Sequence, residues 1–204
     1  MSASVPSRSP LPPSVWPYVG FALSLVASFV AVLGQQAGLM PTLIVGGSML
    51  GGLVCWLLTT ARIPAEPRRV LPIYAATVTL LMVHILEEYV TGFGPRIGQI
   101  IGSGWSEPQF VVMIGLVVPL FWIGSGTLVY LRNPLGNWIL WFIWFGMILG
   151  EPVHLLVFPF LEEGHYSYFP GMWTALLPLV TAVWGMSVLV TDYRLRRSAG
   201  SREA

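Results

Sequence analysis

The sequence predicts an all-α, polytopic membrane protein: a helix bundle with about six transmembrane helices. Of its 204 residues, 55% are hydrophobic and only 9% are charged, and the mean hydropathy is +0.74. An ordinary soluble domain is roughly a quarter charged, so this chain lacks the polar residues to cover a water-facing globule. The composition excludes a soluble enzyme and a disordered chain, and the net charge of +1 gives no reason to expect a nucleic-acid partner.

Six apolar segments are long enough to cross a bilayer about 30 Å thick, which takes about 20 helical residues. Helices are expected because lipid-exposed backbone must satisfy its own hydrogen bonds, and the alternation of a transmembrane barrel is absent. The segments are roughly 16–34, 41–61, 70–92, 109–131, 135–160 and 169–191. They form one bundle over 16–191, between a Ser- and Pro-rich tail over 1–15, predicted to be disordered, and a basic cytoplasmic tail over 192–204.

The arginines predict the orientation of the bundle. All ten basic residues are Arg, and basic residues concentrate in cytoplasmic loops. With six crossings and a cytoplasmic N-terminus, nine of the arginines fall inside and only Arg96 falls outside. Both termini are therefore predicted to be cytoplasmic, in a multi-pass protein of the bacterial inner membrane whose first partner is the lipid bilayer.

Two small-residue and aromatic patterns are typical of helix packing. Gly47-x-x-x-Gly51 lets helices approach closely, and packing within the chain is the plainer interpretation, with a homodimer face as the alternative. Trp138, Trp141 and Trp144 recur at helical spacing, which is more typical of packing or a lipid-facing belt than of a ligand cage.

Polar side chains stand inside two of the apolar segments. The segment over 70–92 contains His84, Glu87 and Glu88, which span an arc of about 100° on a helix and can face one cavity. An acid at the centre of a membrane helix costs about 2.5–3.5 kcal/mol on insertion scales. Neighbouring carboxylates also repel each other, so protonation, a cation or a polar cavity has to compensate.

The segment over 135–160 carries a second pair, Glu151 and His154, on either side of Pro152. Glu-x-x-His is the spacing with which metal sites in helical bundles take two ligands from one helix. His84 lies about 21 Å along its helix from the cytoplasmic end and Glu151 about 24 Å, at 1.5 Å per residue. Both helices run in the same direction, so the two pairs are predicted to lie level, in the outer half of the membrane.

At this point the chain resembles a known family. His84-Ile85-Leu86-Glu87-Glu88 is similar to the signature of the HXXEE-domain bacterial membrane proteins, and the stretch from Glu151 and His154 to Tyr168-Phe169-Pro170-Gly171 and Thr174 resembles that family's second block. The similar part covers roughly 75–185. The resemblance implies that these residues matter, but it implies no reaction.

The leading hypothesis is a divalent metal site. The predicted ligands are His84, Glu88, Glu151, His154 and the loop residue His165, with Glu163 as a further ligand or lid group, and Glu87 and Glu88 are the predicted catalytic acids and bases. Nitrogen and oxygen ligands without cysteine suit Zn, Fe or Mn. A metal-dependent enzyme with this site is expected to act on a lipid or other hydrophobic substrate, by hydrolysis or oxidation.

Two other interpretations stay open from the sequence. In the first, the same cluster relays protons or cations in a small transporter. In the second, the cluster is a polar core without metal, in which a protonated glutamate and the histidines specify helix packing in a membrane scaffold. Metal content separates the three interpretations.

Overall fold

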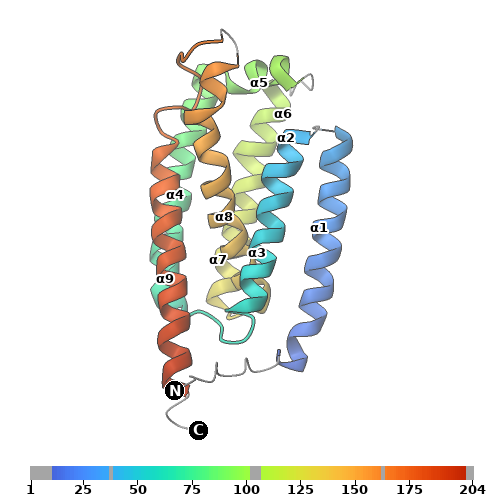
Figure 1. The fold of residues 1–204 in the computed structure, drawn as a ribbon, viewed down its shortest axis with the longest axis vertical. Coiled ribbons are helices and arrows are strands. Elements are labelled where there is room, and N and C mark those ends of the chain that lie inside the picture. Colours follow the sequence, from blue (N-terminus) through green and yellow to red (C-terminus); the bar gives the residue numbers. More distant parts are fainter. Residues whose placement is uncertain (1–10, 37–38, 102–106, 162–163, 201–204) are drawn as a thin grey trace, which may run out of the picture.

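The computed structural model of the chain describes residues 11–36, 39–101, 107–161 and 164–200. All regular structure in these ranges is helical, and the long helices lie side by side in one bundle (Figure 1). The all-α prediction is confirmed. The main helices are α1 (Trp16–Gln36), α3 (Gly47–Leu58), α4 (Pro67–Thr91), α7 (Val118–Tyr130), α8 (Pro134–Leu156) and α9 (Leu176–Gly200).

Five helical stretches among the described residues are long and apolar enough to cross a membrane: Pro13–Gln35, Leu39–Leu58, Pro67–Thr91, Pro134–Phe160 and Leu176–Gly200. Short elements complete some of them: η1 (Pro13–Val15), α2 (Leu39–Pro41), η2 (Thr42–Gly46) and η4 (Phe158–Phe160). The predicted segment over 109–131 contains the shorter apolar helix Ile114–Tyr130. There α6 (Glu107–Val112), η3 (Met113–Val117) and α7 follow one another without a break.

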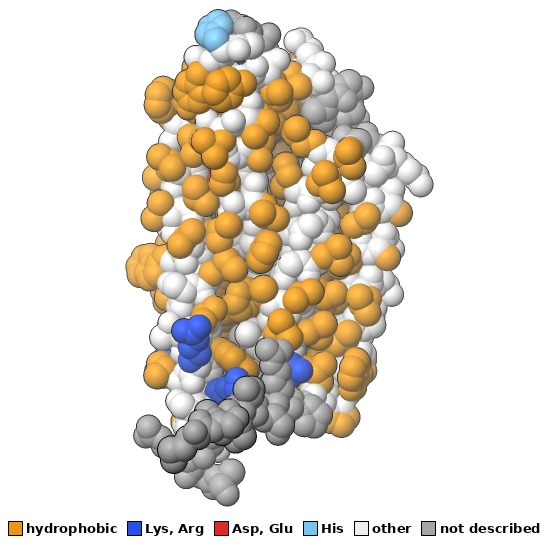
Figure 2. Space-filling model, viewed as in Figure 1, with side chains coloured by type: hydrophobic (Ala, Val, Ile, Leu, Met, Phe, Trp, Pro, Cys, Tyr) orange, Lys and Arg blue, Asp and Glu red, His pale blue; other side chains and the backbone are white. Residues whose placement is uncertain are grey.

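The course of the chain agrees with an even number of crossings. α1 begins and α9 ends at the same end of the bundle, and the chain runs up and down between them (Figure 1). The visible face is covered with hydrophobic side chains, and its arginines gather toward the end where α9 finishes (Figure 2). This end is called the Arg-rich end below. Its cytoplasmic location stays a prediction.

Several predicted boundaries differ from the structure. The last helix begins at Leu176 rather than near 169, because Pro170 and Gly171, which has a φ of 83°, hold the preceding residues in turns. That helix then continues to Gly200 through most of the predicted tail over 192–204. Part of the predicted loop after Gly92 is the helix α5 (Phe93–Ile101). Residues 1–10 and 201–204 of the two predicted tails lie outside the described residues.

Helix α8 is the centre of the bundle and packs against α3, α7 and α9. The predicted tryptophan stripe lies on it and is buried, so the packing interpretation is confirmed. Each indole N–H donates inside the bundle: Trp138 to the carbonyl of Met49, Trp141 to Thr60 and Trp144 to Thr77. The ring of Trp144 packs against α9 at Gly185. A Cβ at this position would lie 2.3 Å from the ring, so the contact requires glycine.

The predicted small-residue groove is partly filled by the chain itself. A Cβ at Gly51 would lie 2.8 Å from the ring of Phe145 on α8, and one at Gly52 would lie 2.6 Å from the backbone of Phe142. Gly47 has nothing within 4 Å of its Cβ position. Packing within the chain therefore accounts for Gly51, and a homodimer through this helix stays a prediction.

Ion pairs join the helix ends at the Arg-rich end. Asp192 is buried on α9, where it pairs with Arg69 at 3.2 Å and accepts a hydrogen bond from the backbone N–H of Glu66 at 3.0 Å. The carboxylate of Glu66 pairs with Arg132 at 2.9 Å and with Arg196 at 3.5 Å. The Arg132 guanidinium holds the pKa of Glu66 below its usual range. These contacts tie together the start of α4, the α7–α8 turn and the end of α9.

Candidate metal centre

Two helices that run in the same direction bring the polar side chains together. α4 starts with Pro67 in its first turn and ends before Gly92, whose φ of 80° stops the helix. α8 starts with the Asn133 side chain accepting from the N–H of Leu135, and it continues through Pro152. Pro152 has no N–H, so the helix loses one backbone hydrogen bond beside Glu151.

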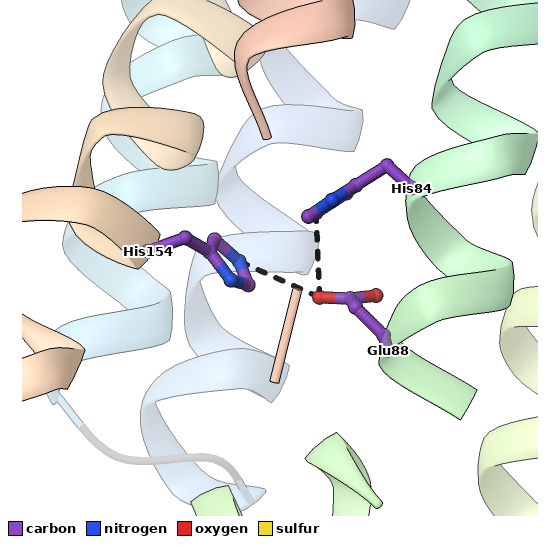
Figure 3. A group of neighbouring side chains, drawn as sticks. All are labelled: His84, Glu88 and His154. Atoms are coloured by element: carbon purple, nitrogen blue, oxygen red, sulfur yellow. Dashed lines mark ion pairs between the residues drawn. The ribbon is translucent and has the colours of Figure 1, made fainter. Parts of the chain in front are cut away.

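The prediction that the polar residues of the two helices lie at the same height is confirmed. Nε2 of His84 on α4 lies 3.1 Å from Oε2 of Glu151 on α8. Oε1 of Glu88 lies 3.6 Å from Nε2 of His84 and 3.4 Å from Nε2 of His154, so it stands between the two rings (Figure 3). The rings meet edge to face with their centroids 4.8 Å apart. All four side chains are buried, with exposed fractions of 2% for His84, 6% for Glu151 and 8% for Glu88 and His154.

The hydrogen bond on the far side of His84 indicates its tautomer. Nδ1 of His84 lies 3.1 Å from Oγ1 of Thr174, and this hydroxyl donates its only proton to Glu87. Oγ1 must therefore accept from His84, so Nδ1 carries the ring proton. In the neutral ring, Nε2 then presents a bare lone pair to Glu88 and Glu151.

His154 is oriented in the same way by a different group. Its Nδ1 lies 3.2 Å from the carbonyl oxygen of Pro170, which can only accept. Nδ1 again carries the proton, and Nε2 faces Glu88. A ligating histidine characteristically donates its other ring N–H to a carbonyl or a carboxylate-linked group, because this fixes the ring and its basicity.

The cluster therefore consists of acceptors. Two imidazole lone pairs and two carboxylates face one another, and Oε2 of Glu151 is buried without a hydrogen-bond partner of good geometry, although it lies close to His84. Unpaired acceptors in a buried site are costly. Only a cation or added protons can satisfy them together.

Two separations in the cluster match those between neighbouring ligands of a metal ion. Around a tetrahedral metal with ligand bonds of 2.0–2.2 Å, neighbouring ligand atoms lie roughly 3.4 Å apart. The observed separations from Glu88 to the two histidines are 3.6 and 3.4 Å. They are longer than the usual 2.7–2.9 Å of a charge-assisted hydrogen bond. His84, Glu88 and His154 each offer one ligand atom, and these atoms all lie within 4.8 Å of one another.

A tight turn and aromatic rings cover the cluster. Gly171 touches all three of these residues: a Cβ there would lie 2.8 Å from Nδ1 of His154 and 2.9 Å from atoms of both Glu88 and His84. The ring of Phe93 stacks on His154 with centroids 5.1 Å apart, and Phe158 lies at 5.0 Å. The cover is apolar, so charge inside the cluster is poorly solvated.

Glu87 is placed apart from the three residues that meet at the centre. Its carboxylate accepts from the hydroxyl of Tyr168 at 2.8 Å and from the backbone and side chain of Thr174. It also accepts from the backbone N–H of Trp173 at 3.3 Å. Glu87 thus holds the turn that precedes α9, and hydrogen bonds link it to His84 through Thr174.

The other predicted ligands lie in the loop before this turn. His165 is exposed and is not one of the three residues that offer converging ligand atoms. Glu163 lies outside the described residues. The contributions of Thr174, Pro170 and Gly171 follow from no spacing in the sequence, which marks these residues only through the resemblance to a family block.

No protein-family model, no curated protein and no solved structure matches the chain. Membership of the HXXEE-domain family stays a prediction, and the function has to be argued from the site.

Proposed function

We propose that the chain is a membrane-embedded metalloenzyme that hydrolyses a lipid or other hydrophobic substrate at a divalent metal centre, with Zn favoured over Fe or Mn. The observation that carries the proposal is the convergence of two imidazole Nε2 lone pairs on a buried glutamate at 3.4 and 3.6 Å, with a second buried carboxylate alongside. We also propose a bacterial inner-membrane location and membership of the HXXEE-domain family.

The four side chains take different roles in this proposal. His84, His154 and Glu88 are the ligands, and two histidines with one glutamate form a set used by catalytic zinc sites, which keep a fourth position for water or substrate. Glu151 is the general base. Its Oε2 is buried without a hydrogen-bond partner of good geometry and lies 3.1 Å from Nε2 of His84, beside the three residues that would hold the metal.

The chemistry follows from these roles. A divalent metal supplies Lewis acidity and makes water a nucleophile at neutral pH. Oε2 of Glu151 accepts the proton that the attacking water loses and delivers it to the leaving group. Thr174 and the Pro170 carbonyl hold the rings with Nε2 inward, and Phe93 and Phe158 limit access of bulk water.

The substrate class follows from where the cluster stands. Its ligands belong to two of the helical stretches that are long and apolar enough to cross a membrane. The neighbouring residues Leu86, Tyr89 and Val90 on α4 are exposed and meet the lipid in this assignment. A substrate that reaches the centre sideways from the bilayer must be hydrophobic over much of its length.

A proton- or cation-coupled transporter is the second candidate, because a chain of hydrogen bonds leads from Tyr168 through Glu87 and Thr174 to His84. A transport path also has to continue toward the Arg-rich end. On that side buried Leu81 and Trp144 belong to the hydrophobic core between the helices. This packing favours the enzyme.

The test compares two histidines. Protein purified in detergent without chelator is expected to contain about one metal ion per chain by mass spectrometry. His154→Ala removes a ligand and is expected to reduce metal affinity more than about 100-fold, beyond the usual 10–100-fold effect of a residue behind a ligand. His165→Ala, the matched control in the exposed loop, is expected to retain the metal.

Two carboxylate variants separate the roles. Glu88→Gln is expected to lose metal, whereas Glu151→Gln retains metal and loses hydrolysis of the substrate. Equal metal content in the wild type and His154→Ala would contradict the metal centre. Ion-dependent flux in liposomes that Glu88→Gln abolishes, with no bound metal, would favour the transporter instead.

A further inference from the structure

A groove opens at the Arg-rich end, between the first turn of α4 and the last turn of α7. Its volume is about 680 Å³. It lies at the opposite end of α4 from the metal centre, so what it binds is independent of the proposed function. Its lining residues are Glu66, Pro67, Arg68, Leu71, Pro72, Tyr130 and Arg132.

The rim of the groove carries an excess of positive charge. Arg68 and Arg132 line it, and Glu66 is the one acid among its lining residues. Glu66 already accepts two contacts from Arg132, at 2.9 and 3.1 Å, and pairs with Arg196. Arg68 is exposed, and no acid in the described ranges pairs with it. One guanidinium therefore lines the groove without an acid partner among the described residues.

Arg132 adopts an unfavourable backbone conformation, which indicates that the contacts of its side chain compensate for the strain. Arg132 has a φ of 56°, and in the described part of the chain it is the one non-glycine residue with a positive φ. It stands just after the end of α7, where glycine or asparagine is usual. An arginine accepts the strained conformation there and places its guanidinium against Glu66, on the rim of the groove.

The wall of the groove changes from cationic to apolar in the direction of the membrane. Arg68 is in the first turn of α4, and Leu71 and Pro72 follow one turn deeper in the same membrane-spanning helix. The opposite wall is Tyr130, whose exposed fraction is 70%. This order of cation and then apolar surface matches a phospholipid, whose phosphate lies at the interface and whose chains run into the bilayer.

We propose that this groove binds an anionic phospholipid, with the headgroup phosphate against Arg68 and Arg132 and an acyl chain along Leu71 and Tyr130. An arginine fork matches phosphate geometry and is weakly hydrated, so it suits such a contact at the membrane interface. A net negative headgroup is favoured because, among the described residues, Glu66 is the one acid that lines the groove and it already pairs with Arg132.

The test measures lipid retention on the intact chain. Native mass spectrometry of the full-length protein, with anionic and zwitterionic phospholipids of identical acyl chains, is expected to show preferential retention of one anionic lipid. Arg68→Gln is expected to reduce that preference at least about tenfold, a ratio that corresponds to 1.4 kcal/mol. Arg197→Gln is the matched control: it removes an exposed arginine of the same end outside the groove and is expected to change the preference less than twofold.

Competition with a soluble phosphate ester distinguishes the lipid from its headgroup. Glycerol phosphate at millimolar concentration is expected to displace no lipid, since it lacks the chain that contacts Leu71 and Tyr130. Equal loss in Arg68→Gln and Arg197→Gln would overturn the proposal in favour of a diffuse charge effect. Displacement by glycerol phosphate would overturn it in favour of a plain phosphate site. An Arg68→Gln protein with unchanged circular dichroism and unchanged lipid preference would exclude the groove.

Discussion

Carboxylates at the two ends of helix α4 have different partners. At the Arg-rich end, Asp192 faces Arg69 at 3.2 Å and Glu66 faces Arg132 at 2.9 Å, so each acid has a counter-charge within the chain. At the other end, the ion-pair partners of Glu88 and Glu151 are histidines whose second nitrogen is already donating to Thr174 or Pro170. The first cluster has its positive charges within the chain, although Oδ1 of Asp192, like Oε2 of Glu151, lacks a hydrogen-bond partner of good geometry. The second cluster has only histidines beside its acids and needs added protons or a cation.

The two clusters are expected to differ in how they affect folding and metal binding. A self-paired cluster contributes to folding and is indifferent to added metal. A buried cluster of acceptors is destabilising until protons or a cation satisfy it, and the proposed function assigns that role to a metal ion. Variants at the two ends of α4 should therefore change different measured quantities.

Among residues behind the proposed ligands, the largest effect is expected from Thr174→Val. This change keeps the shape of the side chain but removes the acceptor for Nδ1 of His84, so the ring loses its orientation. Metal affinity is expected to fall about 10–100-fold, as measured by competition with a calibrated chelator. Thr181→Val is the control, because its hydroxyl bonds only carbonyls of its own helix, at 3.1 Å. Equal affinities in the two variants would show that Thr174 has no role in positioning the ring.

A second comparison uses two glycines with similar backbones. Gly171→Ala and Gly164→Ala both place a side chain at positive φ, 83° and 69°. Only at Gly171 would the new methyl group enter the cluster, since Gly164 has nothing within 4 Å. Gly171→Ala is expected to cost about 1–3 kcal/mol more than Gly164→Ala in unfolding experiments and to lower metal occupancy. Indistinguishable metal content and stability in the two would contradict a turn that closes directly on the ligands.

At the Arg-rich end, Asp192→Asn is expected to affect stability alone. The amide oxygen still accepts from the N–H of Glu66, but the pair with Arg69 is lost. A loss of about 1–2 kcal/mol is expected in denaturant unfolding, with metal content unchanged. A drop in metal content would show that the two ends are coupled and would weaken the comparison.

The smallest effect is the pH dependence of Glu66. Its pKa is lowered below the usual value of 4.5 by Arg132, so its contribution to stability is fully present at neutral pH and is lost as the pH falls through the lowered value. Glu66→Gln is expected to lower the thermal midpoint slightly at pH 7, and this decrease is expected to shrink as the pH falls through the lowered pKa of Glu66. A decrease that stays the same as the pH falls would indicate a packing effect instead of a charge effect.

The sequence predicts the helices and the meeting of α4 with α8 because both depend on local periodicity and on chain direction. It cannot decide between Glu87 and Glu88, since neighbouring residues on a helix point about 100° apart and packing alone sets the rotation. The turn over Phe169–Ala175 has no periodicity at all. Its return to His84 and His154 is a long-range contact, which explains why only the family resemblance marks Thr174 and Gly171, and the role of His165 as a ligand stays a prediction.

The most direct test of the central claim is reconstitution of the wild-type protein, stripped of metal at low pH and returned to neutral pH with Zn, Fe(II) or Mn offered in turn. Uptake of about one ion per chain is expected, together with a higher thermal midpoint, because an ion satisfies acceptors that otherwise stay unpaired. A folded protein that takes up none of the three ions and shows no change in its midpoint would rule out the metal centre.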